Sequence, residues 1–321
     1  MIKNILITGA TGFIGSHVAE RFLDNKKYRV VLISRKEKDY KNINDLKRKG
    51  AKVFEGNFFD RNLLKNIFAE ISVDYVVHIA ALRGGGKGTG SLYRTVNVTG
   101  TESLLEFSLE NKVNKFIFCS SVGVYGTIPG NLPADLNTSF NGDNRYHLSK
   151  IKAEEYVGQY IDRGLNAFII RPAITYGRGD DGFPSTLISL AEKKMFLLSG
   201  EDIKIHLLDV RKFAELTELI LDKEIINSRY FIAADHSPIE LKKLIDLIHY
   251  RKHERHYPPF LVLPSFFFKL AFIMFSMIKN EKWKTRMQLI SKSWYYDISG
   301  TVNNTGYSPS KTEDAFPDMI Q

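Results

Sequence analysis

The sequence predicts an α/β fold with a doubly wound parallel sheet, followed by a smaller, mostly helical C-terminal lobe. Three observations lead to this fold class. Strand-like runs alternate with helical segments through the first half of the chain, and these runs are almost continuously apolar, as in residues 28–33. Strands that are buried on both faces of a sheet have this composition. The alternation loosens beyond Pro172, where the lobe is expected to begin.

Six strands and the helices between them account for the first half of the chain. The strands are expected at residues 2–7, 28–33, 52–55, 75–78, 115–119 and 167–171, and the clearest helices at 60–70, 90–111 and 146–163. Beyond residue 172 the sequence predicts helices near 184–194, 238–250, 264–279 and 283–290, and strands near 203–209 and 229–234. Ligands of a doubly wound sheet bind at the carboxyl ends of its strands. Residues that follow the strands are therefore the candidates for a functional site.

The first predicted strand leads directly into a turn with three regularly spaced glycines. Gly9 permits a tight turn, Gly12 lets the backbone approach a phosphate, and Gly15 lets the next helix pack on the strand. The positive N-terminal end of that helix attracts an anion. The turn therefore predicts a site for the pyrophosphate of a dinucleotide.

The glycine turn also suggests how the chain divides. Residues 1–172 are expected to form a dinucleotide-binding Rossmann domain, to which the strands near 203–209 and 229–234 return. Residues 173–321 are then expected to form a substrate-binding lobe.

Composition excludes several classes of protein. The 321 residues carry a net charge of +9, but no basic stripe is interleaved with aromatic side chains, so nucleic acid is not an expected partner. A small anionic cofactor or substrate would be attracted by this charge. The single cysteine, Cys119, excludes an internal disulfide and fits a reducing cytoplasm, where the protein is expected. Because the first strand begins at residue 2, no cleavable signal is expected.

Residues 260–278 are strongly apolar, although Pro264 and Lys269 interrupt them. The stretch is too short and too broken for a transmembrane span. A buried helix pair that roofs an apolar pocket is the favoured interpretation. Peripheral contact with a membrane is the alternative.

A tyrosine and a lysine lie four residues apart in the predicted helix 146–163. At this spacing the side chains of Tyr146 and Lys150 share one face of the helix. An ammonium about 4 Å from a phenolate stabilises it by roughly 4 kcal/mol at an effective dielectric constant near 20. Such a phenol can transfer a proton near neutral pH. The other interpretation is an ordinary solvated helix face.

Ser121 follows the strand 115–119 and therefore lies at the edge where ligands bind. Its hydroxyl can hold a substrate oxygen against the Tyr146 phenol. Serines after strands also commonly cap a turn, which is the alternative role for Ser121.

Together these features resemble the extended short-chain dehydrogenases/reductases, a superfamily of NAD(P)-dependent epimerases, dehydratases and reductases. The resemblance covers nearly the whole chain, with the motifs in the family's order. They are Thr8-Gly9-Ala10-Thr11-Gly12-Phe13-Ile14-Gly15, His78-Ile79-Ala80-Ala81, Asn97-Val98-Thr99-Gly100-Thr101, Ser121 with Val124-Tyr125-Gly126, Tyr146 with Lys150, Arg171-Pro172, His206-Leu207-Leu208-Asp209-Val210, Asp297-Ile298-Ser299 and Gly306-Tyr307-Ser308-Pro309.

The resemblance implies a role for each candidate catalytic residue. Tyr146 would be the acid/base, and Ser121 would orient the substrate oxygen. Lys150 would bind the nicotinamide ribose and lower the pKa of the phenol. The family often dimerises through a pair of helices, so a homodimer is an implied partner, whereas no metal site is expected.

The resemblance also implies which residues bind the cofactor. Asn57 and Phe58 would border the adenine, and Ala173 would approach the nicotinamide. The other positions belong to the glycine turn and to the groove beside it, and they are Gly9, Thr11, Gly12, Phe13, Ile14, Gly15, Ala80, Ala81, Asn97, Tyr146 and Lys150.

The end of the second strand favours NADP(H) over NAD(H). An NAD site usually places an acidic residue there, whereas this chain has Ser34 and Arg35. Arg35 can pair with and stack on an adenosine 2′-phosphate, and Ser34 can donate a hydrogen bond to it. Surface charge after a strand is the alternative, and NAD then remains the cofactor.

The leading functional hypothesis is an NADPH-favouring oxidoreductase that interconverts a ketone and a secondary alcohol of a small-molecule substrate. The phenylalanines of residues 266–275 favour a substrate of low polarity. Ile174 and Asp202 stand where sugar-nucleotide enzymes often carry asparagine and arginine. The alternative is a nucleotide-sugar 4-epimerase or 4-keto reductase. A non-catalytic NADP sensor is less favoured, because such relatives commonly lose the tyrosine or the lysine.

Overall fold

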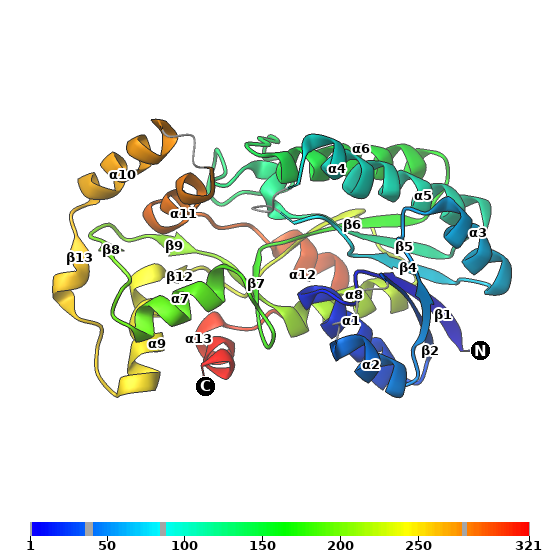
Figure 1. Ribbon diagram of the computed structural model, residues 1–321, viewed down its shortest axis with the longest axis horizontal. Helices are drawn as coiled ribbons and strands as arrows, with labels where there is room; N and C mark the ends of the chain where they lie inside the picture. Colours follow the sequence, from blue (N-terminus) through cyan, green and yellow to red (C-terminus); the bar gives the residue numbers. More distant parts are fainter. Residues whose placement is uncertain (1, 36–40, 84–87, 278–280, 321) are drawn as a thin grey trace.

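The protein has a parallel sheet between two helical layers, with a second lobe at one end of the sheet (Figure 1). The computed structural model describes residues 2–35, 41–83, 88–277 and 281–320. Seven parallel strands form the sheet in the order β11-β6-β5-β4-β1-β2-β3. Their bounds are β1 Lys3–Thr8, β2 Tyr28–Ser34, β3 Lys52–Glu55, β4 Tyr75–His78, β5 Lys115–Cys119, β6 Ala167–Pro172 and β11 Tyr230–Ala233.

The strand order reverses between β1 and β4, and this switch point positions the site. Ligands of open parallel sheets bind in the crevice beyond such a point. Thr8, the last residue of β1, is level with Ile33 of β2 and His78 of β4. The glycine turn and the chain after β2 and β4 therefore leave the sheet at the same edge.

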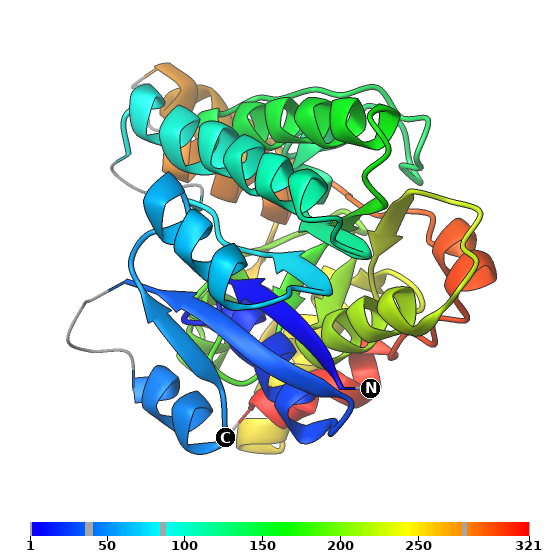
Figure 2. The same cartoon turned by 90° about the vertical axis from the view of Figure 1, so that its right-hand side faces the viewer.

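Each face of the sheet is covered by its own group of helices, as Figure 2 shows from the end. Alternate side chains of β1 point to opposite faces of the sheet. Ile5 and Ile7 pack in one core cluster with Phe22 of α1, whereas Leu6 packs in the other with Leu64 of α3. The helices of the first face are α1 Phe13–Asp24, α2 Lys41–Arg48 and α8 Val210–Asp222, and those of the second are α3 Arg61–Glu70, α4 Gly90–Tyr93, the π-helix Arg94–Thr99, α5 Gly100–Glu110 and α6 Arg145–Asp162.

The second lobe consists of short strands and helices. Three two-stranded sheets, β7 with β10, β9 with β12 and β8 with β13, connect its segments. Its elements are β7 Ile174–Tyr176, α7 Phe183–Glu192, β8 Leu198–Ser199, β9 Lys204–Ile205, β10 Leu207–Asp209, β12 Ile239–Glu240, α9 Leu241–His253, β13 Val262–Leu263, α10 Ser265–Met277, α11 Glu281–Ser291 and α13 Thr312–Ala315, with short 3₁₀ turns at Pro259–Leu261 and Phe316–Met319. Helix α12, Ser299–Thr305, instead packs on β11 of the main sheet and on α8.

Only one of the two segments expected to return to the main sheet does so. Residues 229–234 contain β11, which lies beside β6 at the sheet edge. Residues 203–209 instead form β9 and β10, outside the seven-stranded sheet. The Ala173 N–H still donates to the Ala233 carbonyl of β11, so the chain leaves the main sheet only after Ala173, and β7 then begins at Ile174 and pairs with β10.

The prediction that residues 260–278 are buried is wrong. The helix pair itself is present, because α10 packs against α11. However, six apolar side chains of α10 are at least 46% exposed, so the pair is not enclosed. Hydrophobicity shows that a segment avoids water, but it does not show what covers it. Within the described ranges no helix is long and apolar enough to cross a membrane.

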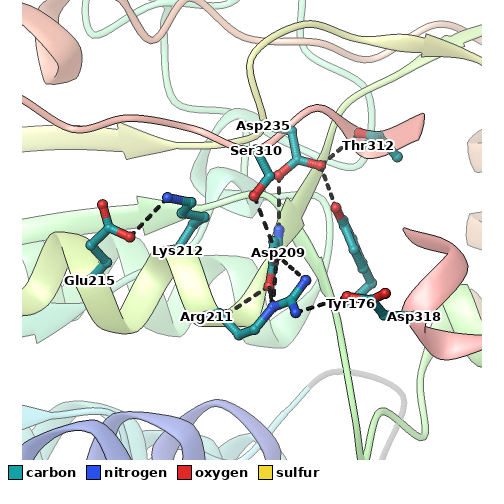
Figure 3. A network of polar contacts seen from close by, with 9 residues as sticks. All are labelled: Tyr176, Asp209, Arg211, Lys212, Glu215, Asp235, Ser310, Thr312 and Asp318. Atoms are coloured by element: carbon teal, nitrogen blue, oxygen red, sulfur yellow. Dashed lines mark hydrogen bonds and ion pairs between the residues drawn. The ribbon is translucent and has the colours of Figure 1, made fainter. Parts of the chain in front are cut away.

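A buried carboxylate joins the second lobe to the end of the main sheet (Figure 3). Asp235 follows β11, and its Oδ1 accepts a hydrogen bond from the Asp209 backbone N–H at 2.9 Å. Its Oδ2 accepts hydrogen bonds from the Tyr176 hydroxyl at 2.9 Å and the Thr312 hydroxyl at 2.6 Å. Arg211 extends the network by pairing with Asp209. One side chain thus connects β7, β10, β11 and the C-terminal segment.

The Asp235→Asn substitution should flatten the pH dependence of stability. Burial raises the pKa of Asp235 from 3.8 to about 6, although its three hydrogen-bond donors act in the opposite direction. Between these values the folded protein keeps a proton that the unfolded chain releases, so the free energy of unfolding should fall as the pH rises from about 4 to about 6, by at most about 3 kcal/mol. Urea unfolding across this range measures the fall, which Asp235→Asn should lack.

A matched control is Asp318→Asn, which alters a largely exposed carboxylate paired with Arg211 at the edge of the same network. This variant should keep the wild-type slope. Parallel pH profiles for Asp235→Asn and the wild type would show that Asp235 does not titrate in this window.

Candidate active site

The glycine turn after β1 is packed so closely that two of its positions exclude any side chain. Gly9 has a φ of +82°, in the left-handed region, and a Cβ there would lie 2.6 Å from the Ala80 backbone nitrogen. A Cβ on Gly15 would lie 2.0 Å from the Gly9 carbonyl oxygen. Strand β1, helix α1 and the chain after β4 therefore meet here backbone to backbone, which forms the cradle that a pyrophosphate requires.

The N-terminus of α1 faces this turn without a side-chain cap. Gly12 is the N-cap residue, and its N–H donates to the Gly9 carbonyl at 2.9 Å. The first turn contains no acidic residue, and Thr11, Phe13 and Ile14 remain partly exposed. The uncapped N–H groups and the helix dipole favour a bound anion. The turn therefore fits a dinucleotide phosphate by geometry and by charge.

Asn42 supports the glycine turn and was not identified from the sequence. It lies in α2, and its Nδ2 donates to the Thr11 carbonyl at 3.2 Å. Nothing near Asn42 in the sequence indicates this contact, because it depends on how α2 packs.

The candidate residues for the adenosine end lie at the same edge of the sheet. Ser34 ends β2 and is buried, and its hydroxyl donates to the carbonyl of the exposed Arg35 at 3.3 Å. Asn57 is exposed in the chain after β3. The ring of Phe58 is buried, with its centroid 5.0 Å from that of His78. The side chain of Phe58 therefore packs in the core, so only its backbone could border an adenine.

Asn97 connects the chain after β4 to α6. Its Oδ1 accepts from the Leu82 backbone N–H at 2.7 Å, and its Nδ2 donates to the Leu82 carbonyl at 3.0 Å and to the Ser149 hydroxyl at 2.9 Å. Asn97 lies in the π-helix Arg94–Thr99, a deviation that often occurs at functional sites. The side-chain amide of Asn97 thus holds Leu82, which follows Ala80 and Ala81, against Ser149 of α6.

Ser121 and Tyr146 lie together at the carboxyl end of β5. Ser121 caps the 3₁₀ turn Val122–Tyr125, because its Oγ accepts from the Gly123 N–H at 3.0 Å. Tyr146 lies in the first turn of α6, which Asn144 caps by accepting from the His147 N–H. The pKa of the phenol is raised above its usual value by burial, and its hydrogen bond with Ser121 acts in the opposite direction. The two alternatives for Ser121 are therefore compatible, since it caps a turn and also contacts the phenol.

His147 holds the Ser121 turn against α6 and was not singled out in the sequence. A Cβ on Gly123 would lie 2.3 Å from a carbon of the His147 ring, so only glycine leaves room for the imidazole. The Nδ1 of His147 is 2.6 Å from Asp143 Oδ1. Hydrogen bonds from His147 and from the Thr127 N–H hold the pKa of Asp143 at about 2, against the effect of burial. These two residues position the turn that carries Ser121.

Lys150 is buried one turn after Tyr146 in α6. Its Nζ donates to the Cys119 carbonyl at 2.7 Å and lies 4.6 Å from the centre of the Phe118 ring. Burial lowers the pKa of Lys150. The role expected of Lys150, to lower the pKa of the phenol beside a bound cofactor, stays a prediction. Burial also raises the pKa of the Cys119 thiol to about 11, which fits a structural cysteine.

A buried ion pair lies directly beneath these residues. Glu154, one turn beyond Lys150, accepts from the Arg171 guanidinium at 2.6 Å and from the Ser120 hydroxyl. Arg171 also donates to the Tyr125 hydroxyl at 2.6 Å. Both members of the pair are at most 4% exposed. The ion pair thus holds α6 against the ends of β5 and β6. Ala173, the residue after β6, donates its N–H to the Ala233 carbonyl at 2.8 Å.

Comparisons with known proteins agree with this arrangement. The model of the NAD dependent epimerase/dehydratase family matches residues 5–232. A UDP-glucose 4-epimerase of Haemophilus influenzae is 32% identical over 63% of this chain and 66% of its own length. A dTDP-D-glucose 4,6-dehydratase of Dictyostelium discoideum is 30% identical over 77% of this chain and 62% of its own length. The matched part of the chain thus spans no more than about two thirds of these two relatives.

A solved structure has the same fold throughout. The UDP-glucuronic acid 4-epimerase of Bacillus cereus, determined in complex with NAD, superposes with a TM-score of 0.77 at 21% identity. The superposition covers 98% of this chain and 96% of that one. Because the family model matches well over half of the sequence, the chain belongs to the NAD dependent epimerase/dehydratase family, whose members are extended short-chain dehydrogenases/reductases.

Proposed function

We propose that this protein is an NAD(P)-dependent oxidoreductase that interconverts a secondary alcohol and a ketone on a small-molecule substrate. The observation that best supports this is the pairing of the Tyr146 phenol with the Ser121 hydroxyl at the carboxyl end of β5. A proton donor and a second hydroxyl that meet there suit a substrate oxygen. The family to which the chain belongs gives independent support.

The roles of the two hydroxyls follow from their contacts. The Tyr146 phenol carries a proton at neutral pH and would donate it to a ketone oxygen as negative charge develops there. Ser121 uses its Oγ as an acceptor for the Gly123 N–H, which leaves its own hydrogen for the same oxygen. The nicotinamide, when bound, supplies or accepts the hydride at the carbon. In the oxidation direction Tyr146 takes the proton back from the alcohol.

The cofactor would lie along the carboxyl edge of the sheet, from Arg35 at the adenosine end to Ala173 at the nicotinamide end. The glycine turn would hold the pyrophosphate, for which its geometry and its uncapped helix are suited. Residues 1–172 would thus bind the dinucleotide, and residues 173–321 would supply the substrate-binding lobe. Lys150 would reach the nicotinamide ribose by exchanging its bond with the Cys119 carbonyl.

We favour a nucleotide sugar as the substrate class over an apolar ketone. The two named relatives above act on UDP- and dTDP-hexoses. The case for an apolar substrate rested on the phenylalanines of α10, but Phe266 and Phe267 are 56% and 46% exposed. Outward-facing rings do not line an enclosed pocket. This observation favours the 4-epimerase or 4-keto reductase alternative.

The direct test offers the protein each nicotinamide cofactor with UDP- and dTDP-linked hexoses and with unlinked ketones. Epimerisation should show a chromatographic change of sugar without net change of cofactor, and reduction should consume the reduced cofactor. Turnover of an unlinked ketone alone would contradict the nucleotide-sugar assignment. Absence of any hydride transfer would contradict the oxidoreductase itself. Light scattering on the same sample tests the implied homodimer.

We further propose that NADP(H) is preferred, on the evidence of Arg35. Its exposed position directly after β2 suits a 2′-phosphate. Arg35→Ala should weaken NADP⁺ binding by about tenfold and change NAD⁺ binding by less than about twofold, as measured by fluorescence titration. Arg29→Ala, an exposed arginine of the same strand, is the matched control and should change neither affinity. An equal loss for both cofactors would contradict a 2′-phosphate contact.

A further inference from the structure

Helix α10 lies at the far end of the second lobe (Figure 1), and several of its apolar side chains are exposed to solvent. We define the α10 outer face by six side chains that are between 46% and 78% exposed: Phe266, Phe267, Leu270, Ile273, Met274 and Met277. Positions 266, 270, 273 and 277 follow the spacing of a single helical stripe. Monomeric proteins rarely expose a large contiguous apolar patch without an interaction that uses it.

The opposite face of α10 is also apolar, and it is the face that packs inside the protein. Phe268 is 6% exposed, and the ring of Phe275 stacks on Trp283 of α11 with 5.7 Å between centroids. The Lys292 ammonium lies 5.9 Å from the centre of the Phe272 ring. Packing against α11 thus accounts for one face of the helix. The outer face needs a second explanation, because folding alone would permit polar residues there.

Most of the net positive charge of the chain comes from residues 251–292, which include α10. Residues 251–292 contain nine lysines and arginines against two glutamates, a net charge of +7 out of +9 for the whole chain. Lys269 is exposed within α10 itself, and Lys292 is exposed just beyond α11. Phe260, which is 75% exposed, extends the apolar surface ahead of α10. Exposed aromatic and aliphatic side chains thus lie in a strongly cationic segment.

We propose that the α10 outer face rests on the surface of an anionic lipid membrane. The 13 residues of α10 extend only about 20 Å, so the helix is suited to lie in the interface and not to span it. Phenylalanine, leucine and isoleucine on one face with lysine beside them are typical of such helices. A second copy of this chain would bring two cationic surfaces together, which disfavours self-association through this face. The inference is independent of the proposed reaction.

Vesicle flotation of the whole protein tests the proposal. The wild type should float with phosphatidylcholine vesicles that contain phosphatidylglycerol, and less with pure phosphatidylcholine or at high salt. The double variant Leu270→Gln/Ile273→Gln should bind the anionic vesicles about tenfold more weakly. The control Ile2→Gln/Ile225→Gln alters two apolar side chains that are 52% and 77% exposed elsewhere, and it should float like the wild type.

Thermal unfolding and cofactor titration of both double variants confirm that they are folded, and they do not depend on knowing the substrate. The proposal is overturned if the wild type remains in the bottom fraction of the gradient with anionic vesicles. It is also overturned if the α10 double variant floats as well as the control variant. It is equally overturned if the α10 substitutions change only the molecular mass in light scattering. That outcome would make the face a protein interface.

Discussion

The Tyr146→Phe variant should lose about 10²- to 10⁴-fold in turnover while its cofactor affinity changes by no more than about threefold. The substitution removes a single oxygen from a partly buried ring. That oxygen contacts Ser121, and it is the group from which a proton would reach the substrate oxygen. Neither the glycine turn nor the packing of α6 depends on it, so cofactor binding should survive.

Steady-state kinetics on the substrate found in the screen would measure this loss as a fall in kcat with little change in KM. Tyr156→Phe is a matched control, because Tyr156 is a partly exposed tyrosine of the same helix. Its kcat should stay near the wild-type value. If Tyr146→Phe kept more than about half of the activity, another group would have to supply the proton, and the proposed role of Tyr146 would be wrong.

The sequence was sufficient to predict the glycine turn after β1, whose glycines recur every three residues. Gly9 and Gly15 require glycine for reasons of backbone geometry, which a local pattern records directly. The end of β5 and the start of α6 were also predictable, because an apolar strand and a capped helix each have local signals. Ser121 and Tyr146 could therefore be expected at one edge of the sheet.

Contacts that depend on side-chain direction could not be predicted in the same way. Spacing placed Lys150 on the same helix face as Tyr146, yet it could not reveal that the ammonium bonds to the Cys119 carbonyl. An apolar ring such as Phe58 fits a core and a ligand groove equally well. Residues such as Asn42 act through distant packing that has no local pattern. The partners of these side chains depend on the tertiary arrangement, because several groups lie within reach of each one.

Whether a segment joins the main sheet was predictable only where its apolar run was long. The short segment 203–209 is apolar enough for a central strand, but β10 pairs with β7, which begins only after the chain has left the main sheet. Likewise, the apolar sequence of α10 could not distinguish an inner face from an outer one. Both faces carry apolar residues, so periodicity contained no information about which is covered.

Removal of one member of the Glu154–Arg171 ion pair is expected to cost more stability than any other single truncation of a polar side chain near the site. Glu154 accepts from Arg171 through both carboxylate oxygens, at 3.0 Å and 2.6 Å, and the guanidinium lies 5.0 to 5.4 Å from the rings of Tyr125, Phe140 and Tyr230. Water cannot replace a lost partner in such an enclosed position. Truncation of one member therefore leaves the other as an uncompensated buried charge.

Glu154→Ala should accordingly lower the free energy of unfolding by about 3 to 5 kcal/mol, as measured by urea denaturation. Glu155→Ala is the matched control, because Glu155 lies at the next position of α6 and pairs with Lys152 at the surface. It should leave the unfolding curve almost unchanged, since exposed pairs contribute little. The double variant Glu154→Leu/Arg171→Met removes both charges and should be more stable than Glu154→Ala.

This double variant separates two explanations for the loss. If the cost of Glu154→Ala came only from missing volume, Glu154→Leu alone, which restores the volume but leaves the guanidinium unpaired, would already recover the stability. If it comes from the unpaired charge, the apolar pair should recover much of the lost stability, because desolvation of two ions offsets most of their attraction. A double variant less stable than Glu154→Ala would thus contradict the electrostatic account. The double variant could instead recover stability but not turnover. Because Glu154 accepts from the Ser120 hydroxyl, that outcome would indicate that the ion pair helps to position Ser120 and the neighbouring Ser121.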